Sequence, residues 1–566
     1  MTRAYALYVN NGTADLGNVE ISAVAVSDSN NVGAYAIYAD NGSKVDITGG
    51  SINAIANDGK KTAYAIYSSN SDVDVTSKNI SINGDIRNDG NGTININLNS
   101  KNAVLNGSVR NNGDEINLAL TNGATWNTSG HNSSKITKLT MDNGIINPEY
   151  TGAMSVDYYS GIGEVIQIIG DDTSGDGSID VDGGRIDIEN ASSGSVINLT
   201  VTNNNLVSTI DNAKALENLN ELAKEVRYDA HDGNLTGKVT IKEGLIMPEV
   251  SGDLLFKETG NHEGYVGNVT TKKTTQTMDA MKNLAATAIV AWRQEDSTLS
   301  QRLGELRESD GGQGIWVRMS RGEFEYDGEY KNQYNFFQMG YDWAAGSWHY
   351  GAAVSHNDGQ TTYTHGDGEN RSTSLSLYGT WLGDKGHYAD IVLKQGRLSN
   401  DFDIYTEAGH TSGDYDAWGT SLSGEYGMKV DLDDGWYVTP QAQLTLMRIG
   451  GEDYTTNNGI KVNQDSLESA VGRVGFEIGK RISNSGSIYA KASLLHDFAG
   501  SADTYLSHKG LTNSYHQDIG DTWCEAGIGF NYKTSENSYV YADVVKTFGG
   551  DVETPWQWNA GMRWTF

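Results

Sequence analysis

The sequence predicts an all-β protein in three consecutive parts: a right-handed parallel β-helix, a linker α-helix and an antiparallel transmembrane β-barrel of about twelve strands. Three observations predict this order. A motif repeats through the first hundred residues, a helical hydrophobic period follows residue 274, and the last part of the chain alternates apolar with polar residues. We place the three parts at residues 1–270, 271–310 and 311–566.

The β-helix is predicted from a repeat that contains two tyrosines. The motif AYALY at Ala4 returns as AYAIY at Ala34 and Ala63, with offsets of 30 and 29 residues. Each copy runs into an Asn-Gly or Asn-Ser turn and then into a short alternating run. A fixed period of this size indicates a solenoid whose turns bury their apolar faces on one another. The content here is strand and turn rather than helix.

The position of the first repeat bears on the N-terminus. The repeat begins at Ala4, whereas a solenoid normally starts with an atypical capping unit. The opening residues also contain no apolar stretch of the kind that a secretory signal peptide needs. We therefore expect that the chain begins inside a longer array and that a signal peptide lies upstream.

Two segments have helical periodicity. In 212–228 apolar residues stand three and four apart, and we expect a helix that packs as a cap or loop on the solenoid. From Thr275 to about Ser309 a longer apolar stripe predicts one continuous helix, with no proline and no glycine before Gly304.

The final segment shows why a membrane barrel is expected. Met562, Trp564 and Phe566 alternate with Arg563 and Thr565, so that one face suits lipid and the other suits a polar lumen. About twelve such segments of roughly 10 residues are joined by polar turns. A soluble β-sandwich also alternates, but its interior could not hold so many large aromatic side chains.

Composition excludes several classes of protein. Lys and Arg number 41 against 73 Asp and Glu, a net charge of −32, so no basic surface for nucleic acid is expected. The single cysteine, Cys524, excludes an internal disulfide and a Cys-based zinc site, and we expect it at a lipid-facing strand position. No apolar run reaches the ~20 residues of a membrane-spanning helix.

Several stretches of the C-terminal part carry a family resemblance. They are IWVR at 315–318, QMGYD at 338–342, LYGTW at 377–381, GHYAD at 386–390, SGEYG at 423–427, VTPQAQL at 438–444 and GMRWTF at 561–566. In this order they resemble the translocator domain of a monomeric autotransporter of the type V secretion class. The segment at 122–141 also resembles the last turns of pertactin-like passengers.

The resemblance implies a location and a mechanism. The barrel would lie in the outer membrane, the helix would thread its lumen, and the β-helical passenger would be displayed on the cell surface or released. The residues of the lumen helix would be Met281, Leu284, Ala288, Trp292 and Leu299. The signal read during barrel assembly would be Met562, Trp564 and Phe566.

The resemblance also implies the partners. These are outer-membrane lipid, the outer-membrane barrel-assembly machinery, periplasmic chaperones, and host or neighbouring-cell surfaces; nucleic acid is not among them, and the barrel is expected to be monomeric. Some relatives cut themselves within the helix at an Asn-Asn pair. This helix offers only the isolated Asn283, so we predict no self-cleavage by that chemistry.

No catalytic residue, cofactor or metal ligand is predicted. GDGS at 175–178 has the wrong order for a serine-hydrolase motif, and His131, His231 and His262 are expected at the surface. The segment at 172–180 resembles a calcium loop. Gly183 stands where that loop needs a bidentate Glu, so an Asp/Gly turn between strands is favoured.

Three functions remain open. The first is an autotransporter whose passenger is an adhesin or a surface structural protein, and in this case the chain is not an enzyme. The second is an autotransporter whose enzymatic domain, a protease or an esterase, lies upstream of this chain. The third is a porin or adhesion barrel with a periplasmic extension, which the helix disfavours because it would plug conduction.

Overall fold

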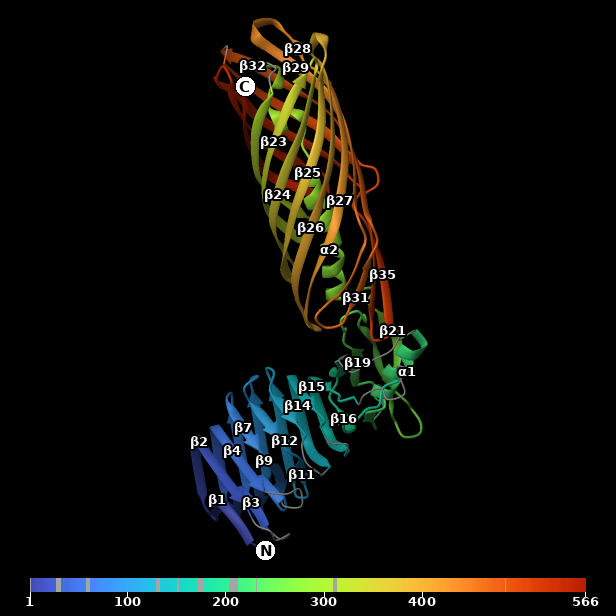
Figure 1. Cartoon of the computed structure of the whole chain (residues 1–566). Helices are drawn as coiled ribbons and strands as arrows, with labels where there is room; N and C mark the ends of the chain where they lie inside the picture. The colour runs from blue at the N-terminus through green and yellow to red at the C-terminus, as the bar shows by residue number, and fades with distance from the viewer. Residues whose placement is uncertain are drawn as a thin grey trace. The chain divides into compact units, whose positions relative to one another are not determined.

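The computed structural model describes residues 2–26, 32–56, 62–128, 133–149, 152–169, 178–202, 212–230, 232–308, 313–483 and 485–566. The chain forms two compact units, Met1–Lys273 and Thr274–Phe566 (Figure 1). No helix among the described residues is long and apolar enough to cross a membrane.

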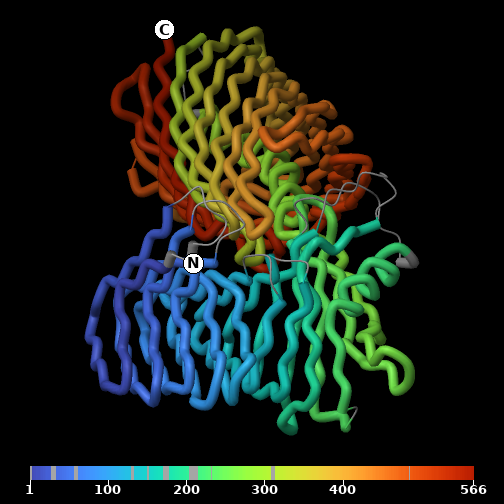
Figure 2. The backbone as a smooth tube through the Cα atoms, turned by 90° about the horizontal axis from the view of Figure 1, so that it is seen from below, coloured from blue at the N-terminus to red at the C-terminus, as the bar shows by residue number. Residues whose placement is uncertain are grey.

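The first unit is a coil of parallel strands, whose turns stack next to one another in Figure 2. The long strand β14 shows the winding, because its three parts pair in parallel with β11, β12 and β13 of the preceding turn. The parallel strands are β1 (Thr2–Asn10), β2 (Thr13–Ala25), β3 (Val32–Asp40), β4 (Lys44–Ala56), β5 (Thr62–Ser69), β6 (Asp72–Ser77), β7 (Ile80–Asn83), β8 (Asp85–Asn88), β9 (Thr93–Asn99), β10 (Val104–Asn106), β11 (Val109–Asn111), β12 (Glu115–Thr121), β13 (Thr125–Asn127), β14 (Ser134–Asn147), β15 (Met154–Ile166), β16 (Ile186–Ala191), β17 (Ser195–Val201), β18 (Val226–Tyr228) and β19 (Leu235–Ile241).

The tyrosine repeats stack in register. Tyr5 pairs with Tyr35, and Tyr35 pairs with Tyr64. Their ring centroids are 5.2 and 5.3 Å apart. The turn residues Asn41 and Asn70 have φ angles of 55° and 53°, in the left-handed region that asparagine tolerates. The predicted parallel β-helix is therefore confirmed.

A column of asparagine side chains links successive turns of the coil. Each side-chain amide donates to the side-chain oxygen of the asparagine one turn earlier, at 2.5, 2.6, 2.6 and 2.7 Å. Such ladders form where identical residues stack in register. The column consists of Asn53, Asn83, Asn106, Asn127 and Asn147.

The end of the first unit changes from parallel to antiparallel pairing. β20 (Val250–Phe256) pairs antiparallel with β19 and with β21 (Gly264–Thr271). Helix α1 (Asn212–Ala223) packs on β19, β20 and β21, with Leu219 and Leu222 buried. The predicted helix exists but is shorter than expected, because Val226–Tyr228 pairs with β16 as strand β18.

The second unit is a closed antiparallel barrel, in which β38 pairs back with β22. Twelve long strands form its wall, as predicted: β22 (Gly314–Tyr326), β23 (Tyr330–Ala345), β24 (Trp348–Tyr363), β25 (Gly366–Leu382), β26 (His387–Thr406), β27 (Gly409–Met428), β29 (Trp436–Ile449), β32 (Leu467–Ser483), β33 (Gly486–Asp497), β36 (Thr522–Ser535), β37 (Ser538–Phe548) and β38 (Val552–Thr565). The shorter pieces are β28 (Val430–Asp431), β30 (Glu452–Thr455), β31 (Lys461–Gln464), β34 (Ser501–His508), β35 (Leu511–Asp518), and the 3-10 turns η3 (Asp384–Gly386) and η4 (Asp433–Gly435).

The barrel wall is apolar outside and polar inside. In β23, Phe337, Met339 and Tyr341 are exposed, whereas Gln338 and Asp342, which point to the opposite face, are buried. This alternation is the pattern of a barrel whose outer face meets lipid and whose lumen is polar.

The segment before the barrel is not the single helix predicted to run to about Ser309. Helix α2 (Gln276–Gln294) ends before Glu295, and α3 (Leu299–Leu303) precedes a 3-10 turn, η2 (Leu306–Glu308). The prediction of one continuous helix is wrong because a new helix starts at Thr298. Its side chain accepts from the Gln301 N–H while the Gln301 side chain accepts from the Thr298 N–H.

Candidate functional site

The lumen of the barrel holds helix α2 (Figure 1). Close to the start of α2, the hydroxyl oxygen of Thr277 lies 3.1 Å from that of Thr406, at the end of β26. One turn and a half later, the Asn283 amide donates to the Glu329 carboxylate at 2.8 Å. The start of α2 is thus bound at the end of the barrel where the β22–β23 and β26–β27 hairpins turn.

The junction between α2 and α3 is bound through acidic side chains. The Lys394 ammonium group on β26 lies 3.3 Å from the Glu295 carboxylate and 2.9 Å from that of Asp296. It also lies 3.8 Å from the ring centroid of Trp292. Arg318 on β22 donates to the backbone oxygen of Glu295 at 3.2 Å. Because Lys394 and Glu295 are both buried, neither charge could be left without its partner at low cost.

Helix α3 is bound through a second ion pair and through its backbone carbonyls. The Arg302 guanidinium lies 2.7 Å from the Asp390 carboxylate, and both side chains are buried. The hydroxyl of Tyr541 donates to the carbonyl of Arg302, and the amide of Asn559 donates to that of Gln301 at 2.9 Å. These wall residues satisfy carbonyls that the short helix leaves without partners.

An apolar cluster closes the lumen around α3. Leu299, Leu303 and Leu306 pack against Trp316 and against aromatic residues of neighbouring strands. The cluster lies near the turns at 346–347 and 383–386, which is the end of the barrel opposite the start of α2. Its wall members are Trp316, Ala353, Tyr378 and Tyr388.

This arrangement holds a chain segment in a defined register. Ion pairs, carbonyl contacts and an apolar cluster are spread along α2, the junction and α3, so the lumen is occupied by the protein's own chain. Within the described ranges, no group of three or more His, Cys, Asp or Glu side chains is placed to hold a metal ion.

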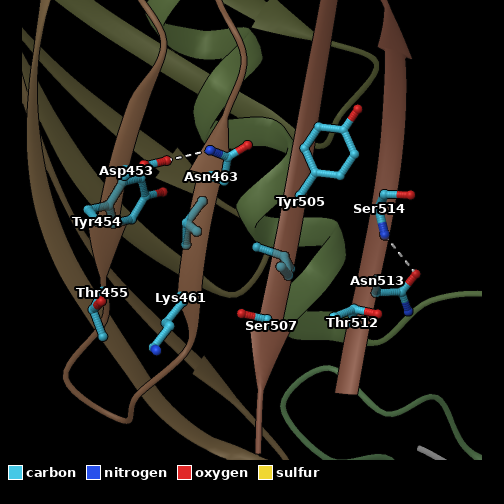
Figure 3. Close-up of a pocket in the computed structure, with 12 residues that line it drawn as sticks. Asp453, Tyr454, Thr455, Lys461, Asn463, Tyr505, Ser507, Thr512, Asn513 and Ser514 are labelled. Carbon is cyan, nitrogen blue, oxygen red and sulfur yellow. Dashed lines mark hydrogen bonds between the residues drawn. The ribbon is translucent and has the colours of Figure 1, made fainter. Parts of the chain in front are cut away.

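A polar hollow of about 580 Å³ lies outside the lumen, on β30, β31, β34 and β35 (Figure 3). There the Asn463 amide donates to Asp453 at 2.5 Å, and the Ser514 N–H donates to the Asn513 side chain at 3.0 Å. The described residues that line it include serine and threonine hydroxyls but no histidine. The hollow therefore offers no hydroxyl nucleophile beside an imidazole base.

The residues singled out in the sequence lie in two places. The five residues of the expected lumen stripe, Met281, Leu284, Ala288, Trp292 and Leu299, are all buried within the second unit. At the C-terminus, Trp564 and Phe566 are 41% and 63% exposed and Met562 is half-buried.

The partners of the lumen segment on the wall were not predicted. Lys394 and Asp390 on β26 and Arg318 on β22 stand at inward positions, and each lies in a polar row of an alternating pattern. A charged residue in the middle of a polar row is the sequence signal that could have indicated these wall residues. The sequence alone does not reveal which wall charge pairs with which charge of the lumen segment.

The remaining candidates lie away from the lumen. His262 is half-buried, with its Nδ1 3.0 Å from an Asp229 carboxylate oxygen. Cys524 pairs with the outward-facing residues Leu494 and Phe548, as its expected lipid-facing position requires. His131, His231 and residues 170–177, which include most of the calcium-like loop, lie outside the described residues.

Fold and lumen together define the class of the second unit, an outer-membrane barrel that carries a segment of its own chain through its lumen. Residues 315–545 match the sequence family described as "Autotransporter beta-domain". The barrel is therefore an autotransporter β-domain, and the predicted resemblance is confirmed. Its predicted location in the outer membrane, in contact with lipid, is confirmed by the same match.

Two relatives and one solved structure illustrate the similarity. The pertactin autotransporter of Bordetella parapertussis is 31% identical over 294 residues, which are 49% of this chain and 31% of that protein. The BrkA autotransporter of Bordetella pertussis is 29% identical over 290 residues, 48% of this chain and 28% of that protein. The crystal structure of the β-domain of the Bordetella autotransporter BrkA matches 45% of this chain and 100% of its own, at 25% identity and a TM-score of 0.38. This chain thus covers about a third of the length of these relatives.

Proposed function

We propose that the chain is part of an autotransporter whose barrel displays the β-helical passenger on the cell surface. The observation that supports this most directly is the lumen segment: the chain passes from the β-helix through α2 and α3 into the first barrel strand at Gly314. In this topology the barrel end at the start of α2 faces outward, and the end at Gly314 and Phe566 faces the periplasm.

We propose further that the passenger acts as an adhesin or a surface structural rod and is not an enzyme. Stacked in-register turns make a rigid column with a repeated surface, which suits attachment. One relative, 23% identical over 309 residues, is named "Autotransporter adhesin/invasin TibA", from Escherichia coli O78:H11. Host or neighbouring-cell surfaces would be its targets, and periplasmic chaperones and the barrel-assembly machinery its partners on the way.

A second candidate is an autotransporter with an enzymatic domain upstream. It is favoured by one observation, that this chain covers only about a third of its relatives' length. The discriminating measurement is hydrolase activity of the natural full-length protein towards peptide and ester substrates. Activity that disappears when the region upstream of this chain is removed would support the second candidate.

Protease shaving of intact cells tests display. We expect loss of residues before about 270 and protection of the barrel, because a folded antiparallel barrel exposes only its turns. Protection of the whole chain would contradict surface display. Cells opened before protease treatment serve as the control that the passenger is cleavable.

A further inference from the structure

An apolar groove of about 860 Å³ lies on the outer face of the barrel, across β32, β33, β36, β37 and β38. Its base contains three small residues, Ala490, Ala542 and Ala560. Ala542 and Ala560 are neighbours in register, and Ala490 pairs with Ile528. Because their side chains end at the β-carbon, the surface is hollow between the larger side chains of Ile488, Ile528 and Val544.

The sides of the groove are large apolar side chains that no other part of the described chain covers. Ile528, Val544 and Ile488 are 67%, 52% and 51% exposed. They lie in the outward rows of the wall, which face lipid in a membrane barrel. An occupant that matches the groove within the membrane is therefore apolar.

One end of the groove carries a cation beside an aromatic ring. Lys480 pairs with Trp436 on one side and Ile488 on the other, and its ammonium group lies 5.0 Å from the Trp436 ring centroid. Lys480 makes no ion pair with any carboxylate of the described residues, whereas its neighbour Arg481 lies 3.0 Å from Asp431.

The position of Lys480 and Trp436 on the barrel indicates which membrane leaflet this end of the groove faces. Trp436 directly follows the turn Asp433–Gly435, at the same end of the barrel as Gly314 and Phe566. Tryptophan and lysine are favoured where the hydrocarbon layer meets the headgroups. Under the orientation given in Proposed function, this is the periplasmic leaflet.

We propose that the groove binds one acyl chain of an anionic phospholipid of the periplasmic leaflet, with Lys480 at the phosphate. Two features favour this occupant: the alanine-lined hollow accepts a hydrocarbon chain, and a lysine without a carboxylate partner complements a negative headgroup. The choice of leaflet rests on the proposed function, whereas the choice of ligand rests on the groove alone.

Native mass spectrometry of the full chain in detergent tests the proposal, with dioleoyl phosphatidylglycerol and dioleoyl phosphatidylcholine as probes. We expect one tightly retained phosphatidylglycerol per chain. Lys480→Gln should lower its retention about fivefold and remove the preference over phosphatidylcholine. Ala490→Phe, which fills the hollow, should lower the retention of both lipids.

Matched controls exist on the same outer face. Lys546 and Ala526 pair with each other, are exposed and do not line the groove. Lys546→Gln and Ala526→Phe should leave lipid retention unchanged. Heat-modifiable migration in gels confirms beforehand that each variant forms a folded barrel.

Three results would overturn the proposal: no lipid retained by the unaltered chain, equal losses in the control variants, or a dimer that Ala490→Phe dissociates. The last would make the groove an interface between two copies. Protease shaving of the same variants separates this outcome from the proposed function. If the passenger is displayed but no lipid is retained, only the proposal of lipid binding in the groove is rejected. If the unaltered chain does not display the passenger, the proposed function is rejected.

Discussion

At the residue scale, the barrel interior depends on glycines that leave room for tyrosine rings. The ring of Tyr541 lies against Gly561, where a β-carbon would come within 2.1 Å of the ring. Tyr437 over Gly479 and Tyr489 over Gly529 are similar, at 2.2 and 2.5 Å. A side chain at these glycines would meet a ring held inside a filled lumen rather than a flexible chain end.

Gly561→Ala should therefore lower barrel stability by about 1–3 kcal/mol, because an added methyl group in a filled interior forces its surroundings apart. The measurement is the temperature at which the barrel loses its heat-modifiable gel migration. Gly424→Ala is the control, since a β-carbon there meets nothing within 4 Å. Equal melting temperatures for the two variants would contradict this reading of Gly561.

In the β-helix, the charge of Asp89 is held by three hydrogen-bond donors. Burial opposes its ionisation, but hydrogen bonds from Arg87, Tyr67 and Asn112 outweigh burial and hold the pKa of the Asp89 carboxyl below its usual range. Tyr67 and Arg87 donate at 2.7 Å and Asn112 at 3.0 Å. A lowered folded-state pKa means that the ionised form stabilises the fold.

The stability of the β-helix should consequently fall as pH drops through this lowered pKa, and be fully present above the pKa of an unfolded aspartate, 3.8. Asp89→Asn should cost about 1–2 kcal/mol at neutral pH and flatten the pH dependence. Urea unfolding followed by circular dichroism at several pH values measures both. Asp157→Asn is the control, because the Asp157 carboxylate accepts no hydrogen bond in the described part of the chain. It should change neither the stability at neutral pH nor its pH dependence.

At the scale of elements, α3 and its buried ion pair explain why the lumen stays filled. Arg302→Met leaves Asp390 buried without its partner, which costs about 3–5 kcal/mol. We expect α3 to leave its place in part of the molecules, so that single-channel conductance in planar bilayers rises above that of the unaltered chain.

Two further variants test whether the buried charge is the cause. Replacing Asp390 by Asn together with Arg302→Met should restore much of the closed state, because no unpaired charge remains. Arg397→Met removes an exposed ion pair, 2.6 Å long, from the same strand, and should have little effect. Raised conductance in the Arg397 variant alone would refute the role assigned to the α3 ion pair.

Elements whose sequence carries its own period were predictable, and those fixed by distant partners were not. The tyrosine repeats predicted the register Tyr5–Tyr35–Tyr64, and alternation predicted a twelve-stranded wall. The break at 295–298 has a local signal, the capping box of Thr298 and Gln301, but the apolar stripe continues across it and hides it. Lys394, which binds this junction, lies about a hundred residues further on, and no local pattern indicates it. Likewise, α1 ends early because residues 226–228 pair with β16, a long-range contact that no local period reports.

At the scale of the whole molecule, the C-terminal residue Phe566 allows the stability of the folded barrel to be tested apart from its assembly into the membrane. The Phe566 N–H donates to the Gln313 carbonyl at 3.0 Å, yet 63% of the residue is exposed. An exposed ring contributes little to the stability of the finished barrel.

If Phe566 is read during insertion, Phe566→Ser should lower the amount of barrel in the outer membrane while the inserted fraction keeps its melting temperature. Quantitative immunoblots of outer-membrane fractions and heat-modifiable migration measure the two quantities. A lowered melting temperature with normal yield would instead make Phe566 a structural residue. Phe530→Ser, a change at an exposed ring within strand β36, is the comparison.

The in-register repeats have an evolutionary consequence. Tyr35 and Tyr64 occupy equivalent places on neighbouring turns, so an in-frame loss of residues 35–63 would set Tyr64 where Tyr35 stood, facing the same neighbour. Gene duplication or deletion in whole repeats can thus lengthen or shorten the column in steps of about 4.8 Å without any new contact having to evolve. The length of the β-helix is therefore a quantity that recombination alone can adjust.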